Sequence, residues 1–167
     1  VNDVPVANPD VATILEDGNL VRNAANGLLS NHTDPDGDIL NITGFTYPGI
    51  GTIPPVIGQP YTMQDLTDPL NPKTIGTITI NANGSYSFVP AVNYNGAVPV
   101  ITYTVSDGRG GVQTSTLAIT ITPVNDAPFA NPQNLTTPED TALPITLTGS
   151  DVEGTALSFI LVGSPTN

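Results

Sequence analysis

Carboxylates in this sequence gather at turns, and two of the turns share one spacing. Asp34-Pro35-Asp36-Gly37-Asp38 has acidic side chains at alternate positions, and Asp151-Val152-Glu153-Gly154 repeats its first two carboxylates and the glycine. Glycine permits a sharp bend, so carboxylates one residue apart can direct their oxygens at one point. Without a cation, two such charges about 4 Å apart repel by about 4 kcal/mol at an effective dielectric near 20. The pattern predicts a site for a hard cation such as Ca²⁺, which takes about 6 to 8 oxygen ligands.

The first turn begins like an EF-hand loop but does not continue as one. Its twelfth position, counted from Asp34, is Phe45, where an EF-hand has a glutamate that binds the ion. An isolated turn of this kind can also be a solvated turn without a ligand. The recurrence of the spacing favours a metal site, and further acidic residues lie in other turns and in two connecting segments: Glu16-Asp17, Glu139-Asp140, Asp107, Asn2-Asp3 and Asn125-Asp126.

A repeated segment organises the chain. Pro123-Val124-Asn125-Asp126-Ala127-Pro128 matches Val1-Asn2-Asp3-Val4-Pro5, which lies 123 residues earlier, and the acidic turns follow at a similar offset. A repeat of this length is a whole domain and not a solenoid unit. The sequence therefore predicts one complete module over residues 1–122, followed by a linker and the beginning of a second module over residues 123–167.

Composition limits the partners and the chemistry. Fifteen acidic residues against three basic ones give a net charge of −12, which disfavours nucleic acid and anionic membrane surfaces and favours cations. Solubility alone is the simpler explanation of this charge.

There is no cysteine, so disulfides and thiolate sites are excluded, and His32 is the single histidine. Because the sequence offers no nucleophilic side chain paired with a general base, we do not expect an enzyme. No apolar run approaches about 18 residues and no signal peptide is visible, so we interpret the chain as an internal piece of a longer protein.

Apolar residues alternate with period two throughout, which predicts strands and no long helix. Asn83-Gly84 predicts a tight hairpin turn. About seven strands with regular turn signals predict an all-β, Greek-key β-sandwich of the immunoglobulin-like type. We expect its strands at 11–15, 20–29 with an interruption at Asn26-Gly27, 40–47, 75–82, 85–89, 100–105 and 117–121, and its core to include Tyr86, Phe88, Tyr103, Ile119 and Ile121.

Two regions depart from this regular plan. Residues 48–74 contain six prolines, which exclude a central strand and predict a long loop or an irregular edge extension. Tyr61 and Met63 could form a small contact surface there. In the second module, strands are expected at 143–147 and 157–161, too few for a stable sandwich.

Taken together, the motifs carry a family resemblance. Val-Asn-Asp-x-Pro, Glu-Asp-Gly, Thr-Asp-Pro-Asp-Gly-Asp, Asn-Gly-Ser-Tyr-Ser-Phe-x-Pro, Asn-Tyr-Asn-Gly, Tyr-Thr-Val-Ser-Asp-Gly-x-Gly-Gly and Pro-Val-Asn-Asp-Ala-Pro follow one another in the sequence. This order resembles the cadherin-like tandem repeats of giant bacterial surface adhesins, many of them RTX adhesins exported by type I secretion. The resemblance covers the chain apart from residues 48–74. It implies an extracellular, bacterial cell-surface location.

In cadherins, Ca²⁺ ions lie between successive modules, and the resemblance assigns ligands on that basis. Asn125 and Asp126 correspond to linker ligands, Asp151 and Glu153 to the acidic pair of the following module, and Glu16 to the glutamate of the preceding one. A second set corresponds to the upper half of a site shared with an upstream module: Asn2, Asp3, Asp34, Asp36 and Asp107. Asn93 or Asn95 stands where cadherins have an acidic residue, so negative charge is missing at that position.

Two functions follow as hypotheses. The resemblance implies a structural extender module, rigidified by Ca²⁺ at its linkers, in an adhesin that supports adhesion or biofilm formation. Its partners would be neighbouring modules of the same polypeptide, with host or surface ligands bound by other modules. The alternative is a glycan- or protein-binding module that uses the 48–74 loop around Tyr61, although the chain has no tryptophan and only nine aromatic residues.

Overall fold

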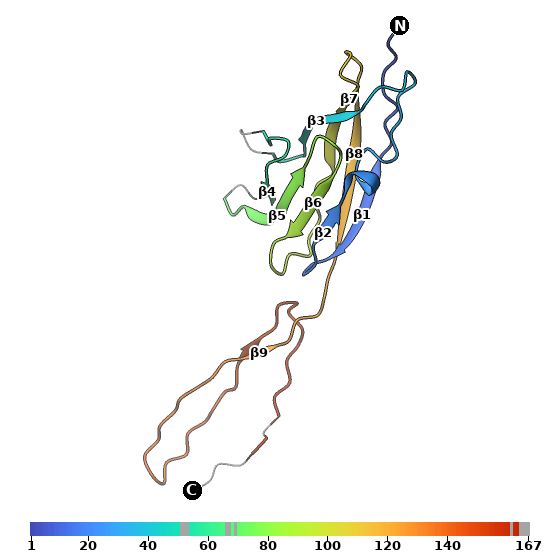
Figure 1. Ribbon diagram of the computed structural model, residues 1–167. Helices are drawn as coiled ribbons and strands as arrows, with labels where there is room; N and C mark the ends of the chain where they lie inside the picture. Colours follow the sequence, from blue (N-terminus) through green and yellow to red (C-terminus); the bar gives the residue numbers. More distant parts are fainter. Residues whose placement is uncertain (51–53, 66–67, 69, 161, 164–167) are drawn as a thin grey trace. The chain divides into compact units, whose positions relative to one another are not determined.

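The computed structural model describes residues 1–167 except 51–53, 66–67, 69, 161 and 164–167. The chain divides into two compact units, Val1–Val124 and Asn125–Asn167. Figure 1 traces the strands of both units. No helix among the described residues is long and apolar enough to cross a membrane.

The first sheet of the first unit has the strand order β1-β8-β7-β3. β1 (Asp10–Leu15) pairs in parallel with β8 (Val112–Thr122), whereas β7 (Ile101–Ser106) pairs antiparallel with β8 and with β3 (Asn41–Thr46). The β7–β8 hairpin lies at the end of the unit where the N-terminus lies (Figure 1). The turn of this hairpin contains Asp107, one of the predicted metal ligands.

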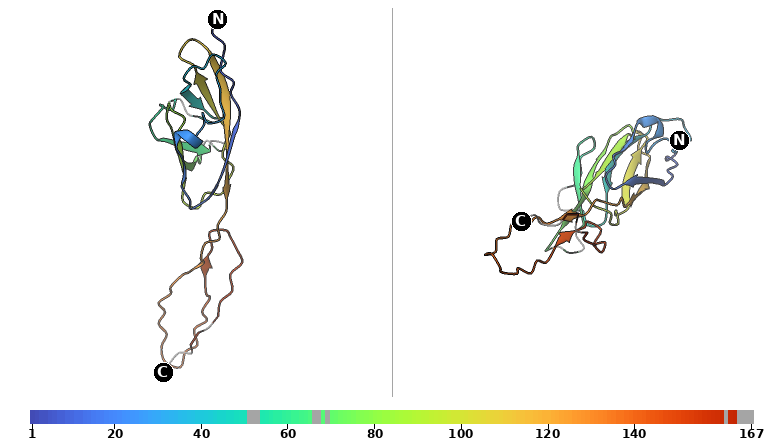
Figure 2. Two further views of the ribbon diagram at one scale, coloured as in Figure 1. Left: turned by 45° about the vertical axis from the view of Figure 1, so that its right-hand side comes forward. Right: turned by 90° about the horizontal axis from the view of Figure 1, so that it is seen from below.

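The second sheet has the order β2-β6-β5-β4 and is antiparallel throughout. Its strands are β2 (Leu20–Arg22), β6 (Tyr86–Pro90), β5 (Lys73–Ile80) and β4 (Tyr61–Asp65). Figure 2 shows β4, β5 and β6, in green, as a layer apart from β7 and β8, in yellow and orange. The predicted hairpin at Asn83-Gly84 joins β5 to β6, and Gly84 has a φ of 83°.

The core fills the space between these two sheets. Alternate residues of β5, β6, β7 and β8 point inward because successive side chains of a strand lie on opposite faces. The structure confirms the predicted all-β sandwich, and all five residues expected in the core are buried: Tyr86, Phe88, Tyr103, Ile119 and Ile121.

A polar cluster is embedded beside this core. The hydroxyl of Tyr103 contacts the carboxylate of Asp10 and lies 3.1 Å from Nε2 of His32, whose ring stacks on Tyr103. Burial raises the pKa of Asp10 and lowers the pKa of His32. His32 is only 8 % exposed, so this single histidine packs within the polar cluster.

The predicted second strand over residues 20–29 is only partly correct. β2 ends at Arg22, and a 3-10 helix, η1 (Ala24–Asn26), follows because the Asn23 side chain accepts hydrogen bonds from the N–H groups of Ala25 and Asn26. Leu28 is fully buried outside any strand, and its N–H donates to the carbonyl of Gly84 at 2.8 Å. The apolar pair at 28–29 therefore reflects packing and not strand pairing.

The proline-rich stretch contributes an edge strand, as predicted for an edge extension. β4 pairs with β5 on one side only and carries an irregularity at Met63/Gln64. Met63 is fully buried and belongs to the core, so it cannot form the suggested contact surface. The half-buried Tyr61 makes edge-on contacts with Phe45 and Tyr47 at centroid distances of 6.3 and 6.2 Å. Residues 51–53, 66–67 and 69 of this stretch lie outside the described residues.

Among its described residues, the second unit contains one short antiparallel pair, β9 (Phe129–Ala130) with β10 (Gly149–Ser150). The strands expected at 143–147 and 157–161 are not formed in the described part of the unit; residue 161 lies outside it. In the first unit the segment matching 157–161 becomes β3 by pairing with β7. No described residue pairs with 157–160 in this way, and an extended segment without a partner is not a strand.

Candidate metal centre

The acidic turn at residues 34–38 is held together by hydrogen bonds to the side chain of its first residue, Asp34. Oδ1 of Asp34 accepts hydrogen bonds from the N–H groups of Asp36 (2.9 Å) and Asp38 (3.2 Å). The carbonyl of Asp34 accepts a third from Gly37 at 3.1 Å, and Gly37 has a φ of 79°. Glycine is favoured at that φ, because a side chain there would introduce backbone strain. The turn therefore wraps around the Asp34 carboxylate.

This folding brings three carboxylates together. Asp34, Asp36 and Asp38 each offer an oxygen, and these oxygens all lie within 4.8 Å of one another. Oδ2 of Asp34 and Oδ2 of Asp38 are enclosed, and neither has a hydrogen-bond partner among the described residues. Enclosed carboxylate oxygens without partners are costly unless a cation or another donor satisfies them. A group of oxygen donors that repel one another fits a hard cation such as Ca²⁺.

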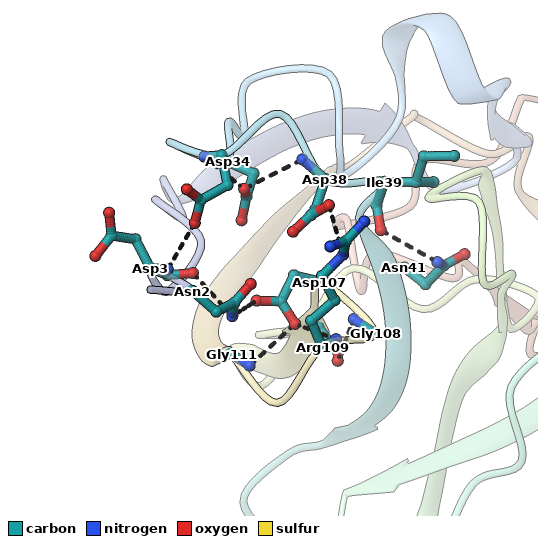
Figure 3. Close-up of polar contacts among 12 residues, drawn as sticks. Asn2, Asp3, Asp34, Asp38, Ile39, Asn41, Asp107, Gly108, Arg109 and Gly111 are labelled. Carbon is teal, nitrogen blue, oxygen red and sulfur yellow. Dashed lines mark hydrogen bonds and ion pairs between the residues drawn. The ribbon is translucent and has the colours of Figure 1, made fainter.

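The N-terminal segment is tied to this turn. The N–H of Asp3 donates to Oδ2 of Asp36 at 2.7 Å, and the side-chain amide of Asn2 donates to the carbonyl of Asp3 at 3.3 Å. The same Asn2 amide donates to Oδ2 of Asp107 at 2.6 Å. Asn2 and Asp3 together therefore connect two acidic loops that are far apart in the sequence (Figure 3).

Asp107 begins the turn between β7 and β8 and is only 5 % exposed. Its Oδ1 accepts hydrogen bonds from the N–H groups of Arg109 (2.7 Å) and Gly111 (2.9 Å). The Asn2 amide, followed by the Arg109 N–H, holds the pKa of Asp107 below its ordinary value. A Cβ on Gly111 would lie 2.1 Å from Oδ2 of Asp107, so glycine is needed to let the loop close over the carboxylate.

Two residues of this site were missed by sequence reasoning. Asp38 lies in the predicted motif but was not among the candidate ligands, and Arg109 was noted only as one of three basic residues. Nε of Arg109 lies 2.8 Å from Oδ1 of Asp38. The alternation Asp34-x-Asp36-x-Asp38 was the available signal for Asp38, whereas the position of Arg109 depends on the β7–β8 hairpin.

Glu16 lies at the other end of the first unit. It follows β1, is 2 % exposed, and its Oε1 accepts a hydrogen bond of 2.5 Å from the N–H of Val124. Its Oε2 is enclosed, with no hydrogen-bond partner among the described residues. A cavity of about 200 Å³ opens beside it, lined in part by Asp17, Asn19 and Val92. Asn93 and Asn95 are both exposed, and neither is among the residues that line this cavity.

The second unit repeats four hydrogen bonds of the first acidic turn and its linker. The N–H of Thr155 donates to Oδ1 of Asp151 at 2.9 Å, and the N–H of Gly154, at a φ of 72°, donates to the carbonyl of Asp151 at 3.2 Å. The N–H of Asp126 donates to Oε2 of Glu153 at 3.2 Å. The amide of Asn125 donates to the carbonyl of Asp126 at 2.9 Å, as Asn2 does to Asp3.

The predicted ligands therefore fall into three places. Five converge at the N-terminal end of the first unit, Glu16 lies at that unit's opposite end, and four converge in the second unit. The first group is Asn2, Asp3, Asp34, Asp36 and Asp107; the last is Asn125, Asp126, Asp151 and Glu153. Their assignment as metal ligands stays a prediction.

Comparison with known proteins adds one match. A search of curated proteins finds none that matches the chain. The family model described as "Bacterial cadherin-like domain" matches residues 2–123, which span the first sandwich and its acidic loops. The chain belongs to the bacterial cadherin-like domain family.

Proposed function

We propose that this chain is a Ca²⁺-binding structural extender module of a large bacterial cell-surface adhesin. The family is one of adhesion-type extracellular modules, which are typically structural and generally bind Ca²⁺. The proposal adds that this chain binds Ca²⁺ through its acidic turns and serves adhesion or biofilm formation by holding other modules away from the cell.

One observation carries the proposal: the same hydrogen-bonded acidic turn occurs in both units. In each, an aspartate accepts a hydrogen bond from the N–H four residues later, and the carboxylate two residues later accepts one from a linker aspartate. Each turn also has an enclosed carboxylate oxygen without a hydrogen-bond partner among the described residues, on Asp34 in the first unit and on Glu153 in the second. The hydrogen bonds alone would suit a solvated turn, but the enclosed carboxylate oxygens favour a cation site, because a buried charge without a partner is costly.

The ligand chemistry supports Ca²⁺ in particular. Asp34 and Asp36 offer clustered carboxylate oxygens to the first site, and Asp107 lies beside them through its hydrogen bond to Asn2. Such hard oxygen donors, in loops able to adjust, suit the large and flexible coordination sphere of Ca²⁺. Mg²⁺ demands a stricter octahedron and keeps more of its water, so it should bind less well.

The energetic consequence is stabilisation linked to external Ca²⁺. Extracellular modules bind the ion with Kd values of roughly 10⁻⁴ to 10⁻³ M. At a hundredfold excess over Kd, binding to the folded state adds about 2.7 kcal/mol to the free energy of unfolding. The order of the motifs, with a linker between Glu16 of one module and Asp151 of the next, suggests that an ion there would also stiffen the chain between successive modules.

Thermal melts with and without Ca²⁺ test the proposal. We compare the parent chain with an Asp34→Asn, Asp151→Asn double variant, and use Asp68→Asn, which removes one exposed acidic charge outside both turns, as the control. We expect Ca²⁺ to raise the Tm of the parent and of Asp68→Asn by several degrees, and that of the double variant much less. Equal shifts in all three, or the same shift with Mg²⁺, would contradict the proposal.

A further inference from the structure

The first acidic site contains a positive side chain among its carboxylates. Arg109 is one of only three basic residues in the chain, and its Nε lies 2.8 Å from Oδ1 of Asp38. The Arg109 side chain is 70 % exposed, whereas that of Asp38 is 11 % exposed. Figure 3 shows the two side chains pointing toward one another across the site. The guanidinium thus reaches in from solvent to a carboxylate that is nearly buried.

Arg109 is fixed at its backbone by the same site. Its N–H donates to Oδ1 of Asp107 at 2.7 Å, which ties the Arg109 backbone to that carboxylate. A cavity of about 320 Å³ is lined by Val1, Asn2, Asp36, Asp38 and Arg109. The guanidinium therefore forms part of the wall of a space toward which two carboxylates open.

Asp38 has one oxygen paired and one unpaired. Oδ1 contacts Arg109, whereas Oδ2 is enclosed with no hydrogen-bond partner among the described residues. Its backbone N–H is bound to Oδ1 of Asp34, which holds its position beside the other two carboxylates of the turn. Asp38 is thus positioned to bind a divalent cation, but only in competition with Arg109.

We propose that Asp38 is a further ligand of the divalent cation and that Arg109 is a tethered competing cation, which neutralises Asp38 without the ion and lowers affinity for it. This inference rests on the proposed function, because it concerns the regulation of the same site. Arginine stays protonated at every physiological pH, so the competition cannot be relieved by deprotonation. Because Arg109 is largely exposed, its ion pair is weak enough for a divalent cation to displace.

The second turn has no equivalent of this pair. Thr155 occupies the position that matches Asp38, and its hydroxyl carries no charge for an arginine to neutralise. The two turns therefore differ in one ligand and in one competing charge. The competition belongs to the first site alone, which allows the second turn to act as an internal control in the same molecule.

The test follows amide shifts during a Ca²⁺ titration of the full chain. Gly37 and Gly111 report on the first site and Gly154 on the second turn. We compare the parent with Arg109→Gln, which removes the charge, Arg109→Lys, which keeps it, and Asp38→Asn, which removes the ligand. Loss of an exposed ion pair predicts a Kd at the first site about two- to fivefold lower in Arg109→Gln, near the parent value in Arg109→Lys, and higher in Asp38→Asn. The Kd reported by Gly154 should be the same in all four.

Melting temperatures separate competition from packing. Without Ca²⁺, Arg109→Gln should melt below the parent because Asp38 loses its counter-ion, whereas its Ca²⁺-induced rise in Tm should exceed that of the parent. An equal loss with and without Ca²⁺, or an unchanged Kd at Gly37 and Gly111, would overturn the role of Arg109 while leaving the Ca²⁺ site in place. Failure of the parent to bind Ca²⁺ at Gly37 and Gly111 would instead contradict the proposed function, and the competition with it.

Discussion

The two acidic turns have nearly the same local geometry but different surroundings. Asp34 and Asp151 each accept from the N–H four residues later, and Gly37 and Gly154 have φ values of 79° and 72°. Only the first turn is joined, in the described residues, to a β7–β8 hairpin that brings Asp107 beside it. The turn is therefore a property of a short segment, whereas the placement of Asp107, a predicted ligand, beside it requires the folded sandwich.

The largest expected difference between the units concerns stability. Phe88 is fully buried in the first unit, whereas Phe129 of the second unit is 61 % exposed. Phe88→Ala should lower the free energy of unfolding by about 3 to 5 kcal/mol because it leaves a cavity. Phe129→Ala should change it by about 0.5 kcal/mol or less. Urea denaturation measures both, and similar losses would mean that the second unit contributes to the same cooperative core.

The next largest effect should distinguish the two proposed cation sites. Asp107→Asn removes a charge from the first site and weakens the hydrogen bonds that its carboxylate accepts. We expect about 10- to 100-fold weaker Ca²⁺ binding there, as for other residues that support a metal site. Amide shifts at Gly154 should titrate unchanged. A parallel loss at both reporters would show that Asp107 acts through global stability and not through the first site.

Replacing the glycine of either turn should weaken Ca²⁺ binding by a similar factor in both turns, and by less than Asp107→Asn does in the first. A Cβ on Gly37 or Gly154 would meet no atom within 4 Å, so alanine there introduces only the strain of a positive φ. That strain is about 1 to 2 kcal/mol, which corresponds to roughly a tenfold loss of Ca²⁺ affinity if binding requires the same turn. Calorimetric titration of Gly37→Ala and Gly154→Ala should find similar losses. A large inequality would contradict the shared geometry.

The smallest effect should be the dependence on pH. Hydrogen bonds from Asn2 and the Arg109 N–H lower the pKa of Asp107 in the folded protein. Its stabilising contribution is therefore complete above the ordinary carboxyl pKa and disappears as pH falls through the lowered value. Acid titration of the Asp107 carboxyl by NMR measures this pKa directly. Asn2→Ala should move the pKa upward, and an unchanged value would rule out the Asn2 hydrogen bond as its main cause.

Period-two alternation and turn chemistry were sufficient to predict the sandwich. The Asn83-Gly84 hairpin and the buried aromatic residues Phe88 and Tyr103 follow from local rules. The strands expected at 143–147 and 157–160 are not formed because pairing depends on partner segments and not on local pattern. The opposite error occurred at Leu28, which is buried in the core without being in a strand, while its N–H donates to the β5–β6 turn.

The candidate site was predictable in part. Asp34 and Asp36 follow from their spacing, because the turn that unites them is local. Arg109 could not be placed from sequence, since its contact with Asp38 depends on the register of β7 with β8. The Tyr103 hydroxyl between Asp10 and His32 likewise joins residues from distant segments, and no spacing rule relates them.

The most direct test of the account is a Ca²⁺ titration of the full chain, following the amide shifts of Gly37 and Gly154 with Mg²⁺ at equal ionic strength as the control. The account predicts saturable shifts at both glycines, with Kd values of roughly 10⁻⁴ to 10⁻³ M, and much weaker effects of Mg²⁺. Shifts that do not saturate, or that Mg²⁺ reproduces in full, would show that the acidic turns are solvated loops and would contradict Ca²⁺ binding.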